Sequence, residues 1–203
     1  MTIFFTSDTH YGHSNIIKFG RGNGIFDSIN HHDEVLRNNW FSTVKPEDTV
    51  YVLGDIALGD IEITLKNFAL LPGRKLLVPG NHDRISSSTN SKSRIERFTP
   101  AYEEVGFEIL PENTSIFIET SKGKREVLLS HFPYAATVHE NAIKDKFAKY
   151  RPVNRGLPLV HGHSHSTERF NPDNKLEFHV GVDANDFKPV NISEIAKWLE
   201  TLN

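Results

Sequence analysis

The sequence predicts an α/β fold, in which helices pack on one sheet and a second, more antiparallel sheet follows. Three short apolar runs, residues 2–7, 49–53 and 74–78, have the composition of buried strands, and helical patterns separate them. Alternating strand and helix patterns indicate a sheet with helices packed on it. Turn residues, in place of helices, separate the three later runs that predict the second sheet: residues 107–110, 115–119 and 125–130.

The first predicted strand, Thr2 to Ser7, is β-branched and aromatic, as buried strands often are. It runs directly into Asp8-Thr-His10, where both outer side chains would face one cation if the backbone stayed extended. Asp8 could instead cap the segment at residues 14–19. His13 is either an ordinary loop histidine or a residue that contacts substrate.

Residues 30–44 carry the first long helical pattern, with apolar side chains at helical spacing. Asn30 and Asp33 resemble a capping arrangement at its start. His31 and His32 lie in its first turn, and we expect both to be exposed to solvent and to bind no cation. This helix is therefore predicted to be scaffold.

The next two predicted strands also end at polar residues. The strand at 49–53 ends in Gly54-Asp55, where the glycine would let the backbone come close to a bound group. After an amphipathic helix predicted over residues 60–70, the strand at 74–78 leads into the stretch from Asn81 to Arg84. Functional groups in such sheets gather at the carboxyl ends of the strands. The strand ends therefore predict one shared site along one edge of the sheet.

The second half of the chain continues the pattern. Residues 86–97 have no clean apolar face and predict a loop or a short exposed helix. Lys122-Gly-Lys predicts a hairpin turn, and the strand after it ends at His131. A strand is predicted at 176–182, and Asn191 with Glu194 forms a capping box for the last helix.

A histidine-rich stretch, His161-Gly-His-Ser-His165, closes the apolar run at 157–160. Because side chains alternate along a strand, His163 and His165 would point the same way, and His161 would join them in a regular strand. Neutral imidazole is the commonest metal ligand in proteins. The stretch suggests a metal site, and the rest of the chain has to supply the other ligands.

The composition limits the class of protein. A chain of 203 residues fits a single domain, over residues 1–203. The net charge of −3 provides no basic field for nucleic-acid or membrane binding. The absence of cysteine excludes disulfides and thiolate ligands. With no signal-peptide pattern and no long apolar segment, we expect a cytoplasmic location; nothing indicates the oligomeric state.

Side chains of metal-ligand type follow five strand ends: Asp8, His10, Asp55, Asn81, His82, His131, His163 and His165. Mixed oxygen and imidazole donors suit Mn, Fe, Zn, Ni or Co better than Ca or Mg alone. The set is too large for one tetrahedral zinc ion and about right for two ions. A carboxylate such as Asp55 could bridge two ions held roughly 3.5–4 Å apart.

Five sequence blocks occur in order over most of the chain: D-x-H (Asp8, His10), G-D (Gly54, Asp55), G-N-H-D (Gly80 to Asp83), His131, and G-H-x-H (Gly162 to His165). In these blocks the chain resembles the calcineurin-like metallophosphoesterases. The resemblance implies a four-layer sandwich of two mixed β-sheets flanked by helices. It also implies a centre with two divalent ions, for which Mn²⁺ is our first expectation.

The resemblance also implies roles for individual residues. One ion would be held by Asp8, His10, Asp55 and His165, and the second by Asp55, Asn81, His131 and His163. His82 would protonate the leaving oxygen or steady the transition state, with Asp83 orienting it. His161 has no place in the pattern, and we expect it to be a packed strand residue.

The implied activity is hydrolysis of phosphoester bonds in nucleotides or other small phosphoesters, by attack of a metal-bound hydroxide. Arg84 would grip a phosphate oxygen or be a surface arginine. A basic segment from Pro133 to Gly156 would border the site and hold an anionic substrate, or be a solvated helix face; its cations are Lys144, Lys146, Lys149, Arg151 and Arg155. A protein Ser/Thr phosphatase and a metal-bound interaction scaffold are the alternatives, and the intact blocks favour an enzyme.

Overall fold

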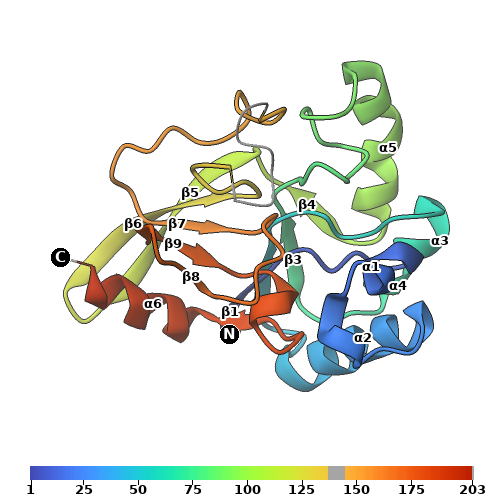
Figure 1. Cartoon of the computed structure of the whole chain (residues 1–203), viewed down its shortest axis with the longest axis horizontal. Coiled ribbons are helices and arrows are strands. Elements are labelled where there is room, and N and C mark those ends of the chain that lie inside the picture. Colours follow the sequence, from blue (N-terminus) through green and yellow to red (C-terminus); the bar gives the residue numbers. More distant parts are fainter. Residues whose placement is uncertain (137–144, 203) are drawn as a thin grey trace.

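The computed structural model describes residues 1–136 and 145–202. Within these residues the strands form two five-stranded sheets (Figure 1). The first sheet has the order β10-β1-β2-β3-β4: β1 is Ile3–Thr6, β2 Thr49–Val52, β3 Arg74–Leu77, β4 Phe107–Ile109 and β10 Val190–Asn191. Strands β1 to β4 run parallel, and β10 is antiparallel to β1.

The second sheet has the order β5-β6-β7-β9-β8: β5 is Asn113–Thr120, β6 Gly123–Ser130, β7 Leu159–His161, β8 Phe170–Asn171 and β9 Asn174–His179. The β5–β6 pair is antiparallel and turns at the predicted hairpin. β6, β7 and β9 are parallel, and β8 is antiparallel to β9. Both sheets are therefore mixed, as expected.

The predicted strand at 107–110 does not belong to the second sheet. It forms β4, which pairs in parallel with β3, with Phe107 opposite Lys75. The reason lies in the segment before it, which was expected to be a loop or a short exposed helix. A helix, α5 (Lys92–Glu104), begins within this segment and continues beyond it. A helix between two strands provides the crossover that parallel pairing in one sheet requires.

The other helices are α1 (Ser14–Lys18), α2 (Ile29–Thr43), α3 (Ile61–Thr64), α4 (Lys66–Ala69) and α6 (Ile192–Thr201), with short 3₁₀ turns η1 (Arg21–Gly24) and η3 (Val182–Ala184). The helix predicted over residues 60–70 is thus divided between α3 and α4. Asn191 caps α6 by accepting a hydrogen bond from the backbone N–H of Ser193, whereas the carboxylate of Glu194, expected to complete a capping box, pairs with Arg169. In the part of the chain that the structure describes, no helix has the length and apolar character needed to cross a membrane.

The start of α2 differs from the prediction, and so does the position of His32. The side chain of Ser28, two residues before Asn30, caps the helix by accepting a hydrogen bond from the backbone N–H of His31. His31 is partly exposed, whereas His32 is fully buried, so the expected exposure of His32 is wrong. His32 lies one turn before the buried Leu36 on the inward face of the helix.

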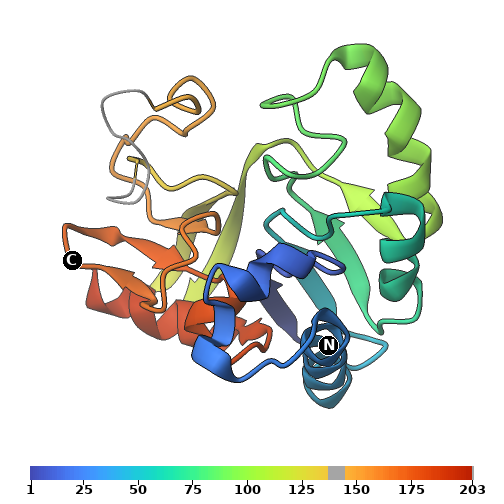
Figure 2. The same ribbon diagram turned by 45° about the vertical axis from the view of Figure 1, so that its right-hand side comes forward.

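Alternation along the strands separates two apolar cores. Phe4 of β1 belongs to a core with Leu36 and Trp40 of α2, on the face of the first sheet that α2 to α5 cover. Phe5 belongs to a second core with Phe178 of β9, and the apolar face of α6 joins it, including Trp198. Figures 1 and 2 show the second sheet on the opposite side of the first sheet from α2 to α5. This packing brings the strand ends of both sheets together.

Candidate metal centre

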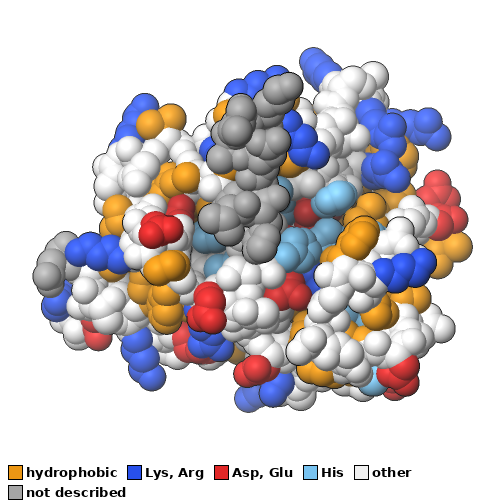
Figure 3. Space-filling model, in the orientation of Figure 1, with side chains coloured by type: hydrophobic (Ala, Val, Ile, Leu, Met, Phe, Trp, Pro, Cys, Tyr) orange, Lys and Arg blue, Asp and Glu red, His pale blue; other side chains and the backbone are white. Residues whose placement is uncertain are grey.

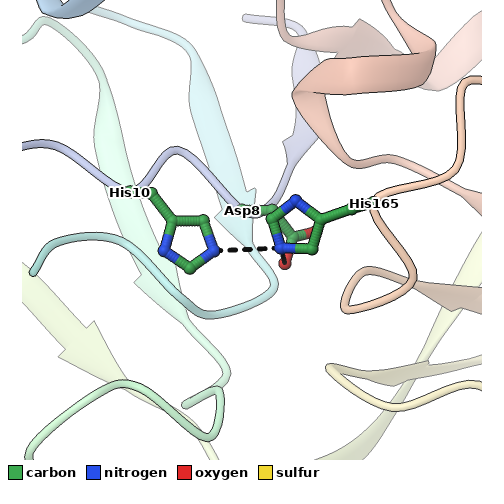
Figure 4. Close-up of side chains that lie close together, drawn as sticks. All are labelled: Asp8, His10 and His165. Carbon is green, nitrogen blue, oxygen red and sulfur yellow. Dashed lines mark hydrogen bonds and ion pairs between the residues drawn. The ribbon is translucent and has the colours of Figure 1, made fainter. Parts of the chain in front are cut away.

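Two groups of potential metal ligands lie where the carboxyl ends of strands from both sheets meet. The first group is Asp8, His10 and His165, and the second is Asp55, His131 and His163. In each group the donor atoms lie within 4.8 Å of one another. Figure 4 shows the first group, in which the Nε2 atoms of His10 and His165 point toward each other and lie 3.1 Å apart.

Asp55 lies between the two groups. Its Oδ2 atom is 3.4 Å from His131 Nε2 and 3.7 Å from His10 Nε2, which belong to different groups. The same oxygen is 4.0 Å from His82 Nε2. The other oxygen, Oδ1, accepts a hydrogen bond from the backbone N–H of His82 at 2.8 Å. One carboxylate oxygen is thus within reach of both groups.

Asn81 lies beside the second group, next to His131. The Oδ1 atom of Asn81 lies 3.0 Å from His131 Nε2, and His163 Nδ1 lies 3.2 Å from the same nitrogen. On the other side of its ring, His131 Nδ1 is 2.8 Å from the carbonyl oxygen of Leu53. An Nδ1–H group that donates to this carbonyl leaves the lone pair of Nε2 directed at the group.

The backbone presents these side chains in a way that strand alternation did not predict. Five of the residues have left-handed φ values: Asp8 (58°), His10 (47°), Asp55 (53°), His163 (70°) and His165 (49°). The backbone at Asp8 and His10 is therefore not extended. β7 ends at His161, so His163 and His165 lie beyond the strand, in different groups. Such conformations are sparsely populated by non-glycine residues and cluster at functional sites.

Glycines let the strand ends approach closely. A Cβ atom on Gly54 would lie 2.4 Å from Gly80 N, and one on Gly162 would lie 1.9 Å from Ser7 Oγ. Gly54 also has a φ of 85°. Side chains at these positions would force apart the loops that carry Asp55, Asn81 and the last histidines.

Neighbouring imidazoles keep the Asp55 carboxylate ionised against the effect of burial. Burial acts to raise the pKa of Asp55, but the His131 imidazole outweighs it and holds this pKa below its usual range. Conversely, burial acts to lower the pKa of His131, and Asp55 outweighs it and raises that pKa to about 9. For His10, burial prevails and lowers the pKa well below its ordinary value. Buried carboxylates, an amide oxygen and imidazoles form a donor set that fits divalent transition-metal ions.

Residues 1–200 match the family model described as calcineurin-like phosphoesterase. The chain belongs to the calcineurin-like phosphoesterase family. It is similar to the Gene 66 protein of Mycobacterium phage L5, with 32% identity over 188 residues that cover 89% of this chain and 86% of the phage protein. The Gene 66 protein of Mycobacterium phage D29 is 33% identical over 186 residues, which cover 90% and 88%.

This chain is also similar to a protein of solved structure. The protein of unknown function AQ665 from Aquifex aeolicus superposes with a TM-score of 0.65 and 27% identity, covering 97% of this chain and 98% of that one. Membership in the calcineurin-like phosphoesterase family indicates a hydrolase that acts on phosphoesters and implies divalent metal ions. The two groups of donors are the candidate sites for these ions.

In this phosphoesterase, His82 lies at the open side of the centre. Its side chain is 46% exposed, and its ring centroid is 5.4 Å from that of His10. His13 lies equally close to His10, also at 5.4 Å, and its ring is 6.1 Å from that of Phe19. Arg84 donates its backbone N–H to the hydroxyl of Tyr102. The rings of His82 and His13 thus both lie beside that of His10.

Asp83 was expected to orient His82, but its side chain contacts other groups. Its buried carboxylate accepts hydrogen bonds from the backbone N–H groups of Asp55, Ile56 and Gly80. None of the hydrogen bonds found in the described segments joins Asp83 to the His82 ring. Burial and the Asp55 charge raise the pKa of Asp83 to about 7. The Asp83 carboxylate thus binds the backbone of the two loops that carry Asp55 and Asn81.

His161 is buried in β7, as predicted for a packed strand residue. Its ring stacks on that of His179, with centroids 5.4 Å apart, and its Nδ1 is 2.8 Å from the Gly162 carbonyl oxygen. It takes no part in either group of donors.

Sequence reasoning missed two residues behind the first group. Arg21, in η1, is buried and donates to the Asp8 carbonyl oxygen at 2.7 Å. Asp183 lies 3.2 Å from His165 Nδ1 and forms an ion pair with Arg21. Asp183 directly follows the predicted strand at 176–182, which is the signal that located the other ligands. For Arg21, in a glycine-rich loop, the sequence offers no comparable signal.

Proposed function

We propose that this protein hydrolyses the phosphoester bonds of nucleotides or other small phosphoesters at a centre of two divalent ions. The observation that carries the proposal is the position of Asp55 Oδ2 between His10 Nε2 and His131 Nε2. One ion would be held by Asp8, His10, Asp55 and His165, and the other by Asp55, Asn81, His131 and His163. The donor set favours Mn²⁺, with Fe, Zn, Ni or Co as alternatives.

The two ions and His82 would contribute differently to hydrolysis. When bound, the two ions would polarise the phosphoester and lower the pKa of a water molecule held between them. His82 faces the open side, where the leaving oxygen needs a proton or a hydrogen-bond donor. Its backbone N–H binds Asp55 Oδ1, so the loop that carries the imidazole is tied to the central carboxylate.

Basic side chains near the second group of donors favour an anionic substrate. The buried ring of Phe147 lies 5.5 Å from that of His163, and the Lys146 Nζ atom lies 4.6 Å from the centre of the Phe147 ring. The basic segment therefore borders the centre where the structure describes it. Figure 3 shows histidine side chains gathered in a hollow, with lysine and arginine side chains on this face.

Not every cation of this segment is available to a substrate. Lys144 lies outside the described residues. Arg151 is buried and forms an ion pair with Asp145, so its role is structural. Lys146 is the candidate for contact with substrate on this side, and Arg84 and His13 are candidates on the other.

A substrate panel tests the proposal: bis-p-nitrophenyl phosphate, p-nitrophenyl phosphate, 2′,3′-cyclic nucleotides and a phosphopeptide, each with added Mn²⁺. We expect turnover of small phosphoesters that is lost on chelation and restored by Mn²⁺. Turnover of the phosphopeptide alone would identify a protein phosphatase instead. No turnover of any member would favour an interaction scaffold.

A further inference from the structure

The two ring nitrogens of His165 face different surroundings. Nε2 faces the first group of donors, 3.1 Å from His10 Nε2 and 4.0 Å from Asp8 Oδ1. Nδ1 faces outward from that group, 3.2 Å from Asp183 Oδ2 and 2.9 Å from Arg21 Nη2. The proton of the neutral ring can therefore lie either toward the donors or toward the Arg21–Asp183 pair.

These two arrangements exclude each other. A guanidinium can only donate hydrogen bonds, and a carboxylate can only accept them. If Arg21 donates to Nδ1 of His165, the proton of the neutral ring lies on Nε2, which then cannot bind an ion. If the proton lies on Nδ1, Asp183 accepts it, and the lone pair of Nε2 is free. Ion binding through Nε2 therefore requires Asp183 as the partner of Nδ1.

Arg21 keeps its hydrogen bonds when Asp183 takes the proton of His165. Its Nη2 atom lies 2.8 Å from Asp183 Oδ2, and its Nη1 atom donates to the Asp8 carbonyl oxygen at 2.7 Å. Nη1 is also 3.4 Å from Nε2 of the buried His32. Both members of the ion pair have nearly buried side chains, with 1% exposed for Arg21 and 8% for Asp183. The guanidinium thus fixes the carboxylate on which His165 depends.

We propose that Asp183 is a positioning residue that holds His165 in the tautomer with its proton on Nδ1, and that Arg21 fixes Asp183 in place. This inference rests on the proposed binding of an ion by Asp8, His10 and His165. A carboxylate behind a metal-binding histidine fixes the tautomer and the orientation of the ring, and its loss typically costs about 10–100-fold in metal affinity.

The test is Asp183→Asn, which keeps the size of the side chain and replaces one acceptor oxygen with a donor. The new amide can donate to Nδ1 and so favours the tautomer with the proton on Nε2. We expect one of two Mn²⁺ equivalents to bind about 10–100-fold more weakly, measured by calorimetric titration of metal-free protein. The affinity for the other equivalent should be nearly unchanged.

A spectroscopic readout separates positioning from a structural role. Two-bond ¹H–¹⁵N correlation in metal-free protein, at a pH where the ring is neutral, reports which nitrogen of His165 carries the proton. We expect Nδ1 in the unaltered protein and Nε2 in Asp183→Asn. Asp183→Glu keeps an acceptor and should recover part of the Mn²⁺ affinity.

Two further variants keep the test decisive. Asp186→Asn, at an exposed residue of the same loop with a φ of 51°, should bind both equivalents normally. Because Asp183→Asn leaves the buried Arg21 charge without its partner, the double variant Arg21→Gln/Asp183→Asn removes both charges together. It should fold and still bind one equivalent more weakly.

The inference is overturned if either folded variant binds two equivalents with unaltered affinities, or if His165 keeps its proton on Nδ1 in Asp183→Asn. A different result overturns the proposed function as well: the unaltered protein binds no divalent ion, or His165→Ala leaves both affinities unchanged. The two failures are therefore distinguishable.

Discussion

The Oδ2 atom of Asp83 accepts a hydrogen bond from the backbone N–H of Asp55 at 2.9 Å. The same oxygen accepts from Gly80 N at 2.8 Å, and Oδ1 accepts from Ile56 N. A side chain expected to orient His82 therefore holds the two loops that place Asp55 and Asn81. Asp55 and the carboxylate that supports its backbone thus follow different strands, β2 and β3.

Asp83→Asn should destabilise the protein. Asparagine has one acceptor oxygen, and its amide would face backbone N–H groups that now donate to a carboxylate, so buried donors would lose their partners. We expect the free energy of unfolding of metal-free protein to fall by about 1–3 kcal/mol, measured by urea denaturation. Asp173→Asn, at an exposed turn, is the control and should change it little. Equal stability of the two variants would show that the buried bonds are unimportant.

Asp55→Asn should weaken the binding of both ions, because one oxygen of Asp55 lies near ligands of both groups. His163→Ala removes a residue of the second group only and should weaken the binding of one ion. Loss of several kcal/mol of charge stabilisation predicts a fall in kcat/KM of at least about 100-fold for Asp55→Asn. Calorimetric titration with Mn²⁺ and steady-state kinetics measure the two effects. Two intact binding events in Asp55→Asn would contradict a bridging role.

His82→Ala should lower turnover while both ions remain bound. Loss of a general acid typically costs about 10²–10⁴-fold in rate. The loss should be larger for an alkyl ester than for a p-nitrophenyl ester, because p-nitrophenolate leaves more easily without a proton. His31→Ala, at a partly exposed histidine of α2, is the control. Metal analysis that finds an ion missing from His82→Ala would assign His82 to metal binding instead.

The sequence predicted which side chains gather at the candidate centre, because each follows a strand and parallel strands bring their carboxyl ends to one edge. It predicted the backbone at these residues poorly. Local sequence favours an extended continuation after Ser7 and His161, whereas Asp8 and His163 adopt left-handed φ values. These conformations depend on hydrogen bonds between distant loops, such as the one from Asp8 N to the Gly54 carbonyl oxygen.

Two other errors had different causes. The helical pattern of α5 becomes visible only beyond residue 97, where Tyr102 continues the apolar face that begins at Ile95. The partnership of Arg21 with Asp183 joins residues 162 positions apart, and no local pattern connects them. The side chains that gather at the centre were therefore predictable from the sequence, while their supporting contacts required the fold.

Metal binding should strengthen as the pH rises toward 9. The pKa of His131 in the metal-free protein is raised to about 9, mainly because Asp55 outweighs the effect of burial. A histidine must be neutral to bind a metal ion, so below this pH an ion has to displace the proton of His131. We expect the apparent affinity for one Mn²⁺ equivalent to increase with pH between about 6.5, the ordinary histidine value, and 9.

The raised pKa of His131 also determines how the stability of the metal-free protein changes with pH. Because the folded-state pKa lies above the unfolded value, the protonated His131 stabilises the metal-free protein below about pH 6.5, and this contribution is lost as the pH rises through 9.

Calorimetric titration with Mn²⁺ in buffers of different ionisation enthalpy counts the protons released at neutral pH. His131→Gln should release fewer protons than the unaltered protein. Equal proton release by the two would mean that His131 is neutral before the ion binds.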